Sequence, residues 1–214
     1  MDAKLNKIIE DLIERYPKLM NKQKNIEDGY LLLQDCYKNN AKVLTCGNGG
    51  SAADAGHITA ELMKGFLLKR SLNKNDTSLF ENEEHLSNKL QYGLPAISLS
   101  AQSELITAIA NDNGDEMVFA QQVFAYGRKN DVLIAISTSG NSLNVINGVK
   151  VAKRIGMKVL ALTGADVGVV GMLADVVISA PETKTFKIQE YHLPLYHALC
   201  AMLEVYFFDS NEGE

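Results

Sequence analysis

The stretch DVLIAISTSGNS, residues 131–142, joins a strand to a turn rich in hydroxyl groups and then to a helix. Its residues 132–136 form a continuous apolar run, which is typical of a short strand buried on both faces. Strands alternating with helices form right-handed crossovers and a parallel sheet. The sequence therefore predicts an α/β fold, a three-layer αβα sandwich around a five-stranded parallel sheet. The other four strands are expected at 42–46, 95–99, 158–163 and 175–179, among helices at 52–66, 102–111, 116–126, 143–155 and 185–208.

The hydroxyl-rich turn predicts a phosphate site. A helix start leaves backbone N–H groups unpaired and carries a partial positive charge, so added hydroxyls make a donor-lined cup for an anion. The alternative is that Asn141 or Ser142 is an ordinary N-cap and the other hydroxyls face water. Four hydroxyls at one strand end favour the phosphate site, and these belong to Ser137, Thr138, Ser139 and Ser142.

Composition limits the class of protein. A chain of 214 residues is long enough for one well-packed domain, and we expect a single domain over 1–214. The net charge of −5 argues against a nucleic-acid binder, since such proteins usually carry a basic surplus. No apolar run reaches the length of a membrane span, and the N-terminus does not resemble a signal peptide. We therefore expect a cytoplasmic protein that binds neither nucleic acid nor a membrane.

Two segments lie outside the alternating pattern. Residues 1–40 hold two amphipathic helices that precede the first strand. They either form an oligomer contact with another copy of the chain or cover their own sheet, and the sequence leaves both open. Residues 67–93 form a polar insertion that is long for a connection of this kind. One interpretation of the insertion is a mobile flap beside the site, with a short helix at 81–90.

A glycine-rich turn, GNGGS at residues 47–51, follows the first strand. The spacing Gly47-x-Gly49-x-x-Ala52 matches a dinucleotide fingerprint, but such a domain has an acidic residue at the end of the next strand, where this chain has SAQ at 100–102. A nicotinamide cofactor is therefore disfavoured. Gly49 and Gly50 instead allow the backbone to approach a small polar ligand closely.

Two separated helices carry candidate catalytic groups. His57 and Glu61 share one helix face a turn apart, so they suit either a metal ion or a base beside a carbonyl group. A solvated ion pair is the alternative, but ligands in open α/β sheets gather at the carboxyl ends of the strands, where this helix begins. On the last helix, Gln189 and His197 lie about two turns apart. His197 alone, among apolar neighbours, would more often be a core histidine.

Three motifs resemble those of the sugar isomerase (SIS) domain: GNGGSAADAGHITAEL at 47–62, ISTSGNS at 136–142 and IQEYHLPLYH at 188–197. The likeness is greatest to the sedoheptulose 7-phosphate isomerases and covers nearly the whole chain. It implies a flavodoxin-like fold and a homotetramer with sites at subunit boundaries. It also implies an aldose–ketose isomerase whose product enters heptose biosynthesis for surface polysaccharide.

The resemblance also assigns roles to residues. It implies phosphate binding by the hydroxyls at 137–139 and 142, and sugar contacts by Asn48, Ser51 and Asp112. In some members of the family a zinc ion is held at the positions of four residues, which are here His57, Glu61, Gln189 and His197.

The expected reaction moves a proton between C1 and C2 of the sugar through an enediolate, which converts D-sedoheptulose 7-phosphate to D-glycero-D-manno-heptose 7-phosphate. Glu61 is the candidate base, and His197 is the partner that protonates the other carbon or oxygen. A zinc ion would act as a Lewis acid or hold the open-chain sugar.

Two departures and two alternatives accompany the resemblance. Phe186 stands where these isomerases carry an aspartate near the substrate, and the 67–93 insertion is longer than the family pattern. One alternative is a non-catalytic SIS protein that binds a replication-initiator protein. That group interrupts the STSGNS turn with a basic residue and lacks the last-helix histidine, whereas this chain has Ser139 and His197. The other alternative is a SIS isomerase or sensor for a different phosphosugar.

Overall fold

The computed structural model describes residues 2–209 and contains one five-stranded parallel sheet with the strand order β2-β1-β3-β4-β5. This is the flavodoxin-like order, so the predicted fold is confirmed. The order reverses between β1 and β3, whose carboxyl ends carry the glycine-rich and hydroxyl-rich turns. The strands are β1 (Val43–Cys46), β2 (Ala96–Ser98), β3 (Val132–Ile136), β4 (Lys158–Thr163) and β5 (Val176–Ser179).

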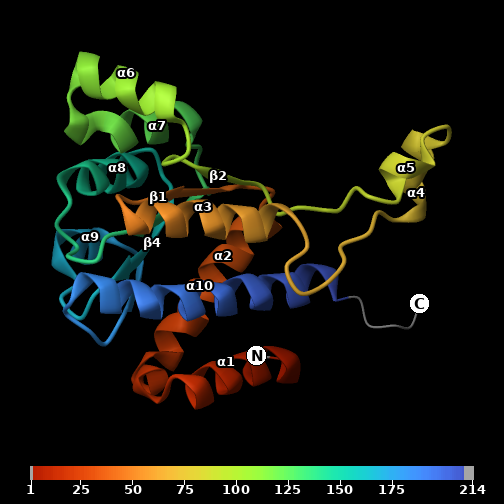
Figure 1. Cartoon of the computed structure of the whole chain (residues 1–214), viewed down its shortest axis with the longest axis horizontal. Coiled ribbons are helices and arrows are strands. Elements are labelled where there is room, and N and C mark those ends of the chain that lie inside the picture. Colours follow the sequence, from red (N-terminus) through yellow and green to blue (C-terminus); the bar gives the residue numbers. More distant parts are fainter. Residues whose placement is uncertain (1, 210–214) are drawn as a thin grey trace.

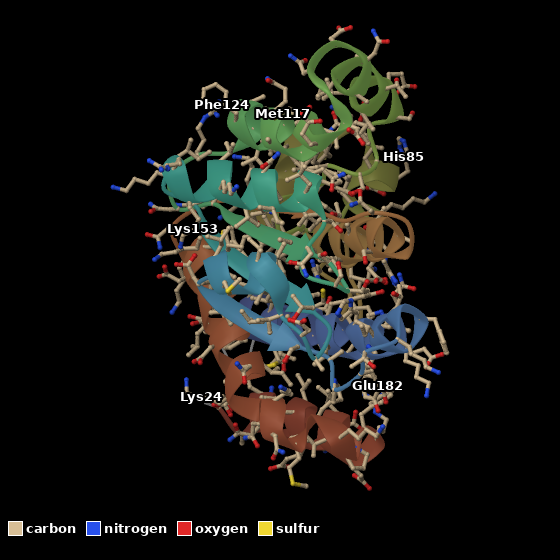
Figure 2. The ribbon with its side chains drawn as sticks, turned by 90° about the vertical axis from the view of Figure 1, so that its left-hand side faces the viewer. Lys24, His85, Met117, Phe124, Lys153 and Glu182 are labelled. Atoms are coloured by element: carbon tan, nitrogen blue, oxygen red, sulfur yellow. The ribbon has the colours of Figure 1, made fainter. Side chains whose placement is uncertain are left out.

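Helices cover both faces of the sheet (Figure 1). One face packs under α2 (Gln23–Lys38), α3 (Gly50–Met63) and α10 (Thr185–Phe208), and α1 (Ala3–Arg15) lies outside α10 in the same core cluster. The other face packs under α6 (Ser103–Asn113), α7 (Val118–Tyr126), α8 (Leu143–Arg154) and α9 (Gly168–Leu173). Figure 2 shows these layers from the side, with Phe124 on one side of the sheet and Lys24 on the other. Short 3₁₀ helices lie at Pro17–Lys22 and Asp115–Met117.

Of the two N-terminal helices, α2 packs on the sheet and on α10, and α1 packs on α10. On α2, Gly29 lies against the side chains of Ile178 and Leu160, so the helix approaches β4 and β5 closely. Ile26, Tyr30 and Leu33 of α2 are buried in the same core cluster. Helix α1 lies against α10 (Figure 1). The helices therefore cover their own fold, and an additional oligomer contact stays a prediction.

The insertion projects from the body of the molecule (Figure 1). It contains α4 (Lys74–Thr77), a 3₁₀ helix at Ser78–Phe80 and α5 (Glu84–Ser87), and none of the three contains a buried residue. The helix expected at 81–90 is thus only one turn long, because no apolar face packs it against the core. An isolated antiparallel bridge between Ser71 and Gln91 closes the base of this projection. Among residues 2–209, no helix is long and apolar enough to cross a membrane.

Candidate active site at the carboxyl edge of the sheet

The hydroxyl-rich turn contains no ordinary side-chain cap for α8. Ser142 occupies the N-cap position of α8, yet its side chain makes no capping hydrogen bond. Its hydroxyl instead accepts a hydrogen bond from the Ser137 hydroxyl at 3.2 Å. Asn141 is not the cap either, because its amide donates to the Ser139 carbonyl at 2.9 Å and accepts from the Val169 N–H at 3.2 Å.

Gly140 allows this turn to form. Its φ of 66° lies in the left-handed region, and a Cβ there would collide with the carbonyl group of Val167. The turn thus presses against the segment before α9. Within it, Ser137 is buried, Thr138 is half-buried and Ser139 is exposed, so the hydroxyls line a path from the interior to the surface.

The glycine-rich turn lies beside the hydroxyl-rich turn. Gly49 has a φ of 56° and directly precedes α3. The amide groups of Asn48 and Asn144 exchange two hydrogen bonds, at 2.8 and 3.0 Å, which join this turn to the first turn of α8. Ser51 is buried at 4% exposure in the first turn of α3. The predicted contact residues at 48–51 therefore meet the predicted phosphate turn.

A cavity of ≈ 270 Å³ opens beside the glycine-rich turn. Asn48 and Gly49 line it, together with Asp115 from the 3₁₀ helix before α7. The predicted contact residue Asp112 does not line this cavity; it is exposed and accepts a hydrogen bond from Asn111 at 2.8 Å. Sequence reasoning missed Asp115, since one acidic residue in the polar run 111–116 is not distinguishable from another by spacing.

Gln189 also reaches this region. It lies in the first turns of α10, where a Cβ on Gly50 would collide with its side-chain amide. A Cβ on Gly164 would meet both Ile188 and the Thr138 carbonyl oxygen, so the start of α10 also adjoins the hydroxyl-rich turn. The two turns and Gln189 therefore form one polar region at the carboxyl edge of the sheet.

Helices α3 and α10 run side by side in the same direction from this edge (Figure 1) and bring the acid–base candidates together. The His57 Nε2 atom lies 3.0 Å from Glu61 Oε1 and 3.5 Å from His197 Nε2. The two imidazole rings are nearly perpendicular, at 86°, with centroids 4.9 Å apart. Glu61 and His197, which are far apart in the sequence, thus lie near each other within one chain, because each contacts His57.

Of the four residues that the resemblance assigns to a metal ion, Gln189 lies apart from the other three. Gly50, beside Gln189, precedes His57 by about two turns of α3, which is roughly 10 Å along the helix axis. No hydrogen bond of the described residues joins Gln189 to His57, Glu61 or His197.

Sequence reasoning missed one residue at this group, Tyr196. Its hydroxyl lies 2.9 Å from His57 Nδ1 and 3.4 Å from Asp54 Oδ1. Asp54 lies one turn before His57 on α3, but nothing in the spacing of the sequence indicated the tyrosine. The contact arises from the packing of α3 on α10, which the pattern of a single helix does not contain.

Burial sets the electrostatics of this group. Burial, and secondarily the nearby His57 side chain, lowers the pKa of His197, so the His197 imidazole is neutral near pH 7. Burial also raises the pKa of Asp54 and of the Tyr196 hydroxyl. Glu61 Oε2 is buried without a hydrogen-bond partner, although Lys64 Nζ lies 3.6 Å away.

The other histidine of α10 and the three cysteines belong to the core. His192 is fully buried, and its Nε2–H donates to the Thr163 carbonyl at 3.0 Å. Burial lowers the pKa of His192, which keeps the ring neutral. All three cysteines are buried and unpaired, and burial raises the pKa of each thiol to about 12, as expected for core packing: Cys36, Cys46 and Cys200.

The donor chemistry around His57 fits a divalent cation. Two imidazole nitrogens and a carboxylate oxygen face one another, and the second oxygen of Glu61 has no hydrogen-bond donor. Nitrogen and oxygen donors of this kind suit zinc. In residues 2–209, however, no three His, Cys, Asp or Glu side chains are arranged to hold a metal ion as they stand.

Comparisons with known proteins show the family of this chain. The SIS domain family model matches residues 7–93 and 90–164. A phosphoheptose isomerase of Helicobacter pylori (strain P12) is 43% identical over 189 residues, which make up 88% of this chain and 88% of that protein. A phosphoheptose isomerase of Neisseria gonorrhoeae (strain NCCP11945) is 42% identical over 182 residues, covering 84% of this chain and 81% of that one.

Solved structures show the same similarity. The structure of a phosphoheptose isomerase from Neisseria gonorrhoeae has a TM-score of 0.71 and 36% identity, covering 94% of each chain. The structure of a phosphoheptose isomerase from Francisella tularensis has a TM-score of 0.74 and 31% identity, covering 95% of this chain and 98% of that one.

Proposed function

Because the chain belongs to the SIS domain family, we propose that it is an aldose–ketose isomerase of the phosphoheptose isomerase type. The reaction is the conversion of D-sedoheptulose 7-phosphate to D-glycero-D-manno-heptose 7-phosphate. One observation carries this proposal beyond the family: Glu61 and His197 meet through His57, within the same helix pair whose starts border the hydroxyl-rich turn. Acid–base groups at one end and an anion site at the other suit a long phosphosugar.

The distance along α3 supports a seven-carbon substrate. The hydroxyl-rich turn, Gln189 and Gly50 lie at the start of the helix pair, and His57 lies roughly 10 Å further along. An extended zigzag chain of seven carbons, with six bonds of ~1.5 Å, spans roughly 8 Å from end to end. A sugar with its phosphate at Ser137, Thr138, Ser139 and Ser142 would therefore present C1 and C2 to the His57 group. Binding energy at the phosphate then orients the reacting carbons.

The acid–base roles follow from protonation states. A neutral imidazole can accept and donate a proton near pH 7, and burial keeps His197 in that form. Glu61 removes the proton from one carbon while His197 gives its ring proton to the carbonyl oxygen, which forms the enediol. His197 then takes the proton of the neighbouring hydroxyl as the new carbonyl forms, and Glu61 returns its proton to the other carbon, so both groups recover their starting state. Lys64 Nζ lies 3.6 Å from Glu61 Oε2. Its positive charge would balance the negative charge that develops on the substrate oxygens.

A zinc ion fits the same place. His57, Glu61 and His197 would hold it, and Gln189 would have to approach from the neighbouring turns of α10. When bound, zinc would polarise the carbonyl group as a Lewis acid and hold the open-chain sugar.

Isomerisation of sedoheptulose 7-phosphate, followed by NMR, tests the function. The wild-type protein, supplied with zinc, should form the aldose. Glu61→Gln and His197→Ala should each lower turnover by about a hundredfold or more. His85→Asn on the exposed insertion is the matched control and should leave turnover unchanged. Wild-type rates in either site variant would remove that residue from the mechanism.

A different phosphosugar is the second candidate, and Phe186 favours it. This side chain is 58% exposed near the start of α10, where the family pattern has an aspartate. An aromatic ring there removes a hydrogen-bonding partner from the substrate region. The same NMR assay with five- and six-carbon and amino-sugar phosphates decides between them, by the ratio of kcat/KM values.

The non-catalytic alternative predicts a different result. A protein that binds a replication initiator would show no conversion of any phosphosugar and tight binding of the initiator. Ser139 and His197 both take part in the site geometry, which supports the enzyme over this alternative. We also propose that the protein is a cytoplasmic homotetramer.

A further inference from the structure

Asp54, Tyr196 and His57 form a chain of polar contacts behind the reactive face of the site. The Tyr196 hydroxyl lies between the other two, 2.9 Å from His57 Nδ1 and 3.4 Å from Asp54 Oδ1. Tyr196 is 2% exposed, and its ring packs edge-on against His57, with centroids 5.5 Å apart and planes at 73°. The contact is therefore held inside the interface of α3 with α10.

The number of protons limits how this chain can bond. A phenol has one proton and can also accept a hydrogen bond, whereas an ionised carboxylate only accepts. Asp54 Oδ2 is buried and has no hydrogen-bond partner, so Tyr196 is the only side-chain donor that reaches this carboxylate among the described residues. If Tyr196 donates to Asp54, its oxygen accepts the Nδ1–H of His57.

We propose that Asp54 and Tyr196 are positioning residues that hold His57 with its proton on Nδ1, so that Nε2 presents a lone pair toward Glu61 and His197 for a divalent cation. A metal-binding histidine usually donates its other ring N–H to such a partner, which fixes its tautomer and orientation. In the reverse arrangement Tyr196 donates to Nδ1 and the proton sits on Nε2, where it can be donated to Glu61 Oε1 at 3.0 Å as long as no cation is bound. A cation at this place has to displace that proton, and the Asp54–Tyr196 pair favours the displacement by accepting the Nδ1–H. This inference rests on the zinc site of the proposed function.

Zinc affinity, measured by competition with a chromogenic chelator, tests the proposal without an activity assay. Tyr196→Phe keeps the ring packing and removes only the hydroxyl; Asp54→Asn keeps the size and removes the charge. Each should weaken zinc binding by about 10- to 100-fold. Tyr30→Phe is the matched control, because that buried phenol only receives a hydrogen bond from Gln34, at 2.6 Å, and its loss should leave zinc affinity unchanged.

Long-range ¹H–¹⁵N NMR of the zinc-loaded protein tests the tautomer directly. The chain has 4 histidines, so the His57 signals can be assigned from a His57→Asn spectrum. We expect a protonated Nδ1 and a metal-bound Nε2 in the wild type, and an altered Nδ1–H signal in Tyr196→Phe.

Zinc bound through Nδ1, unchanged affinity in both variants, or no zinc binding by the wild type would each overturn the proposal. The isomerase assay stands apart from these outcomes: an active enzyme with unchanged zinc affinity in Tyr196→Phe would refute the positioning role and leave the proposed function intact.

Discussion

At the scale of single residues, Arg70 and Glu204 form a buried ion pair. Both side chains are buried, at 2% and 0% exposure, and Arg70 Nε donates to Glu204 Oε1 at 2.8 Å. Glu204 also accepts the backbone N–H groups of residues 66–68, at 2.6 to 2.9 Å. This clamp holds Phe66 beside His197, with ring centroids 5.2 Å apart. Glu204 therefore contributes to the stability of the fold and also keeps Phe66 in place beside His197.

Glu204→Gln should destabilise the protein by about 3–5 kcal/mol, because it leaves the guanidinium of Arg70 buried without a counter-charge. Urea unfolding followed by circular dichroism measures the change. The exposed pair of Arg15 and Asp11 provides the control, and Arg15→Ala should cost at most about 0.5 kcal/mol. A loss below about 1 kcal/mol in Glu204→Gln would show that the clamp contributes little net stability.

A second prediction at this scale concerns pH, through His192. Burial lowers its pKa below the unfolded value of about 6.5, so between the two values the unfolded state binds the proton and the native state does not. Its contribution is therefore complete above about pH 6.5 and is lost as pH falls toward the lower, native pKa. His192→Asn should reduce the slope of stability against pH in that window. His85→Asn, which changes an exposed histidine, should leave the slope unchanged, and equal slopes in all three proteins would contradict the assignment.

At the scale of elements, the sequence predicted best where one strong pattern covers a whole segment. The strands at 132–136 and 158–163 and the helix at 185–208 have the predicted bounds, because continuous apolar runs and helical periodicity persist to their ends. The insertion was predicted poorly, since its polar residues follow no period and its two α-helical turns pack on nothing buried. The Tyr196–His57 contact depends on how α3 packs against α10, which local pattern does not encode.

The insertion gives the prediction at this scale. Ser71 and Gln91 form an antiparallel bridge, so residues 73–89 can be replaced by Asn-Gly to close a two-residue hairpin. Arg70 and Tyr92 stay in place. Because the short helices of the insertion contain no buried residue, thermal stability should change little, by less than about 1 kcal/mol. Steady-state kinetics of the shortened protein then show whether the insertion covers the substrate: a raised KM with unchanged stability would indicate that it does.

At the scale of the whole molecule, a cavity of ≈ 730 Å³ lies beside the polar region of the site rather than in it. It runs between α1 and α10, where apolar side chains such as Leu193 and Ala201 form much of its lining. Lys4, Lys7 and Arg15 of α1 also line the cavity. Apolar side chains together with a few charged ones are typical of a surface that another protein chain covers. His197 also lines this groove, so a molecule bound in the groove would shield the group of His57, Glu61 and His197 from solvent on that side.

We predict that a second copy of the chain covers the α1–α10 groove, as part of the proposed oligomer. Leu193 is 40% exposed on its wall, and Leu193→Glu should place a charge in the interface and shift the assembly toward smaller species. Leu79→Glu is the control, because Leu79 is 76% exposed on the projecting insertion and should not affect association. Size-exclusion chromatography with light scattering measures the mass of each variant, and circular dichroism confirms that both stay folded. A wild-type monomer, or a Leu193→Glu protein of unchanged mass, would contradict the prediction; a smaller assembly that also loses turnover would indicate that the neighbouring copy completes the site around His197.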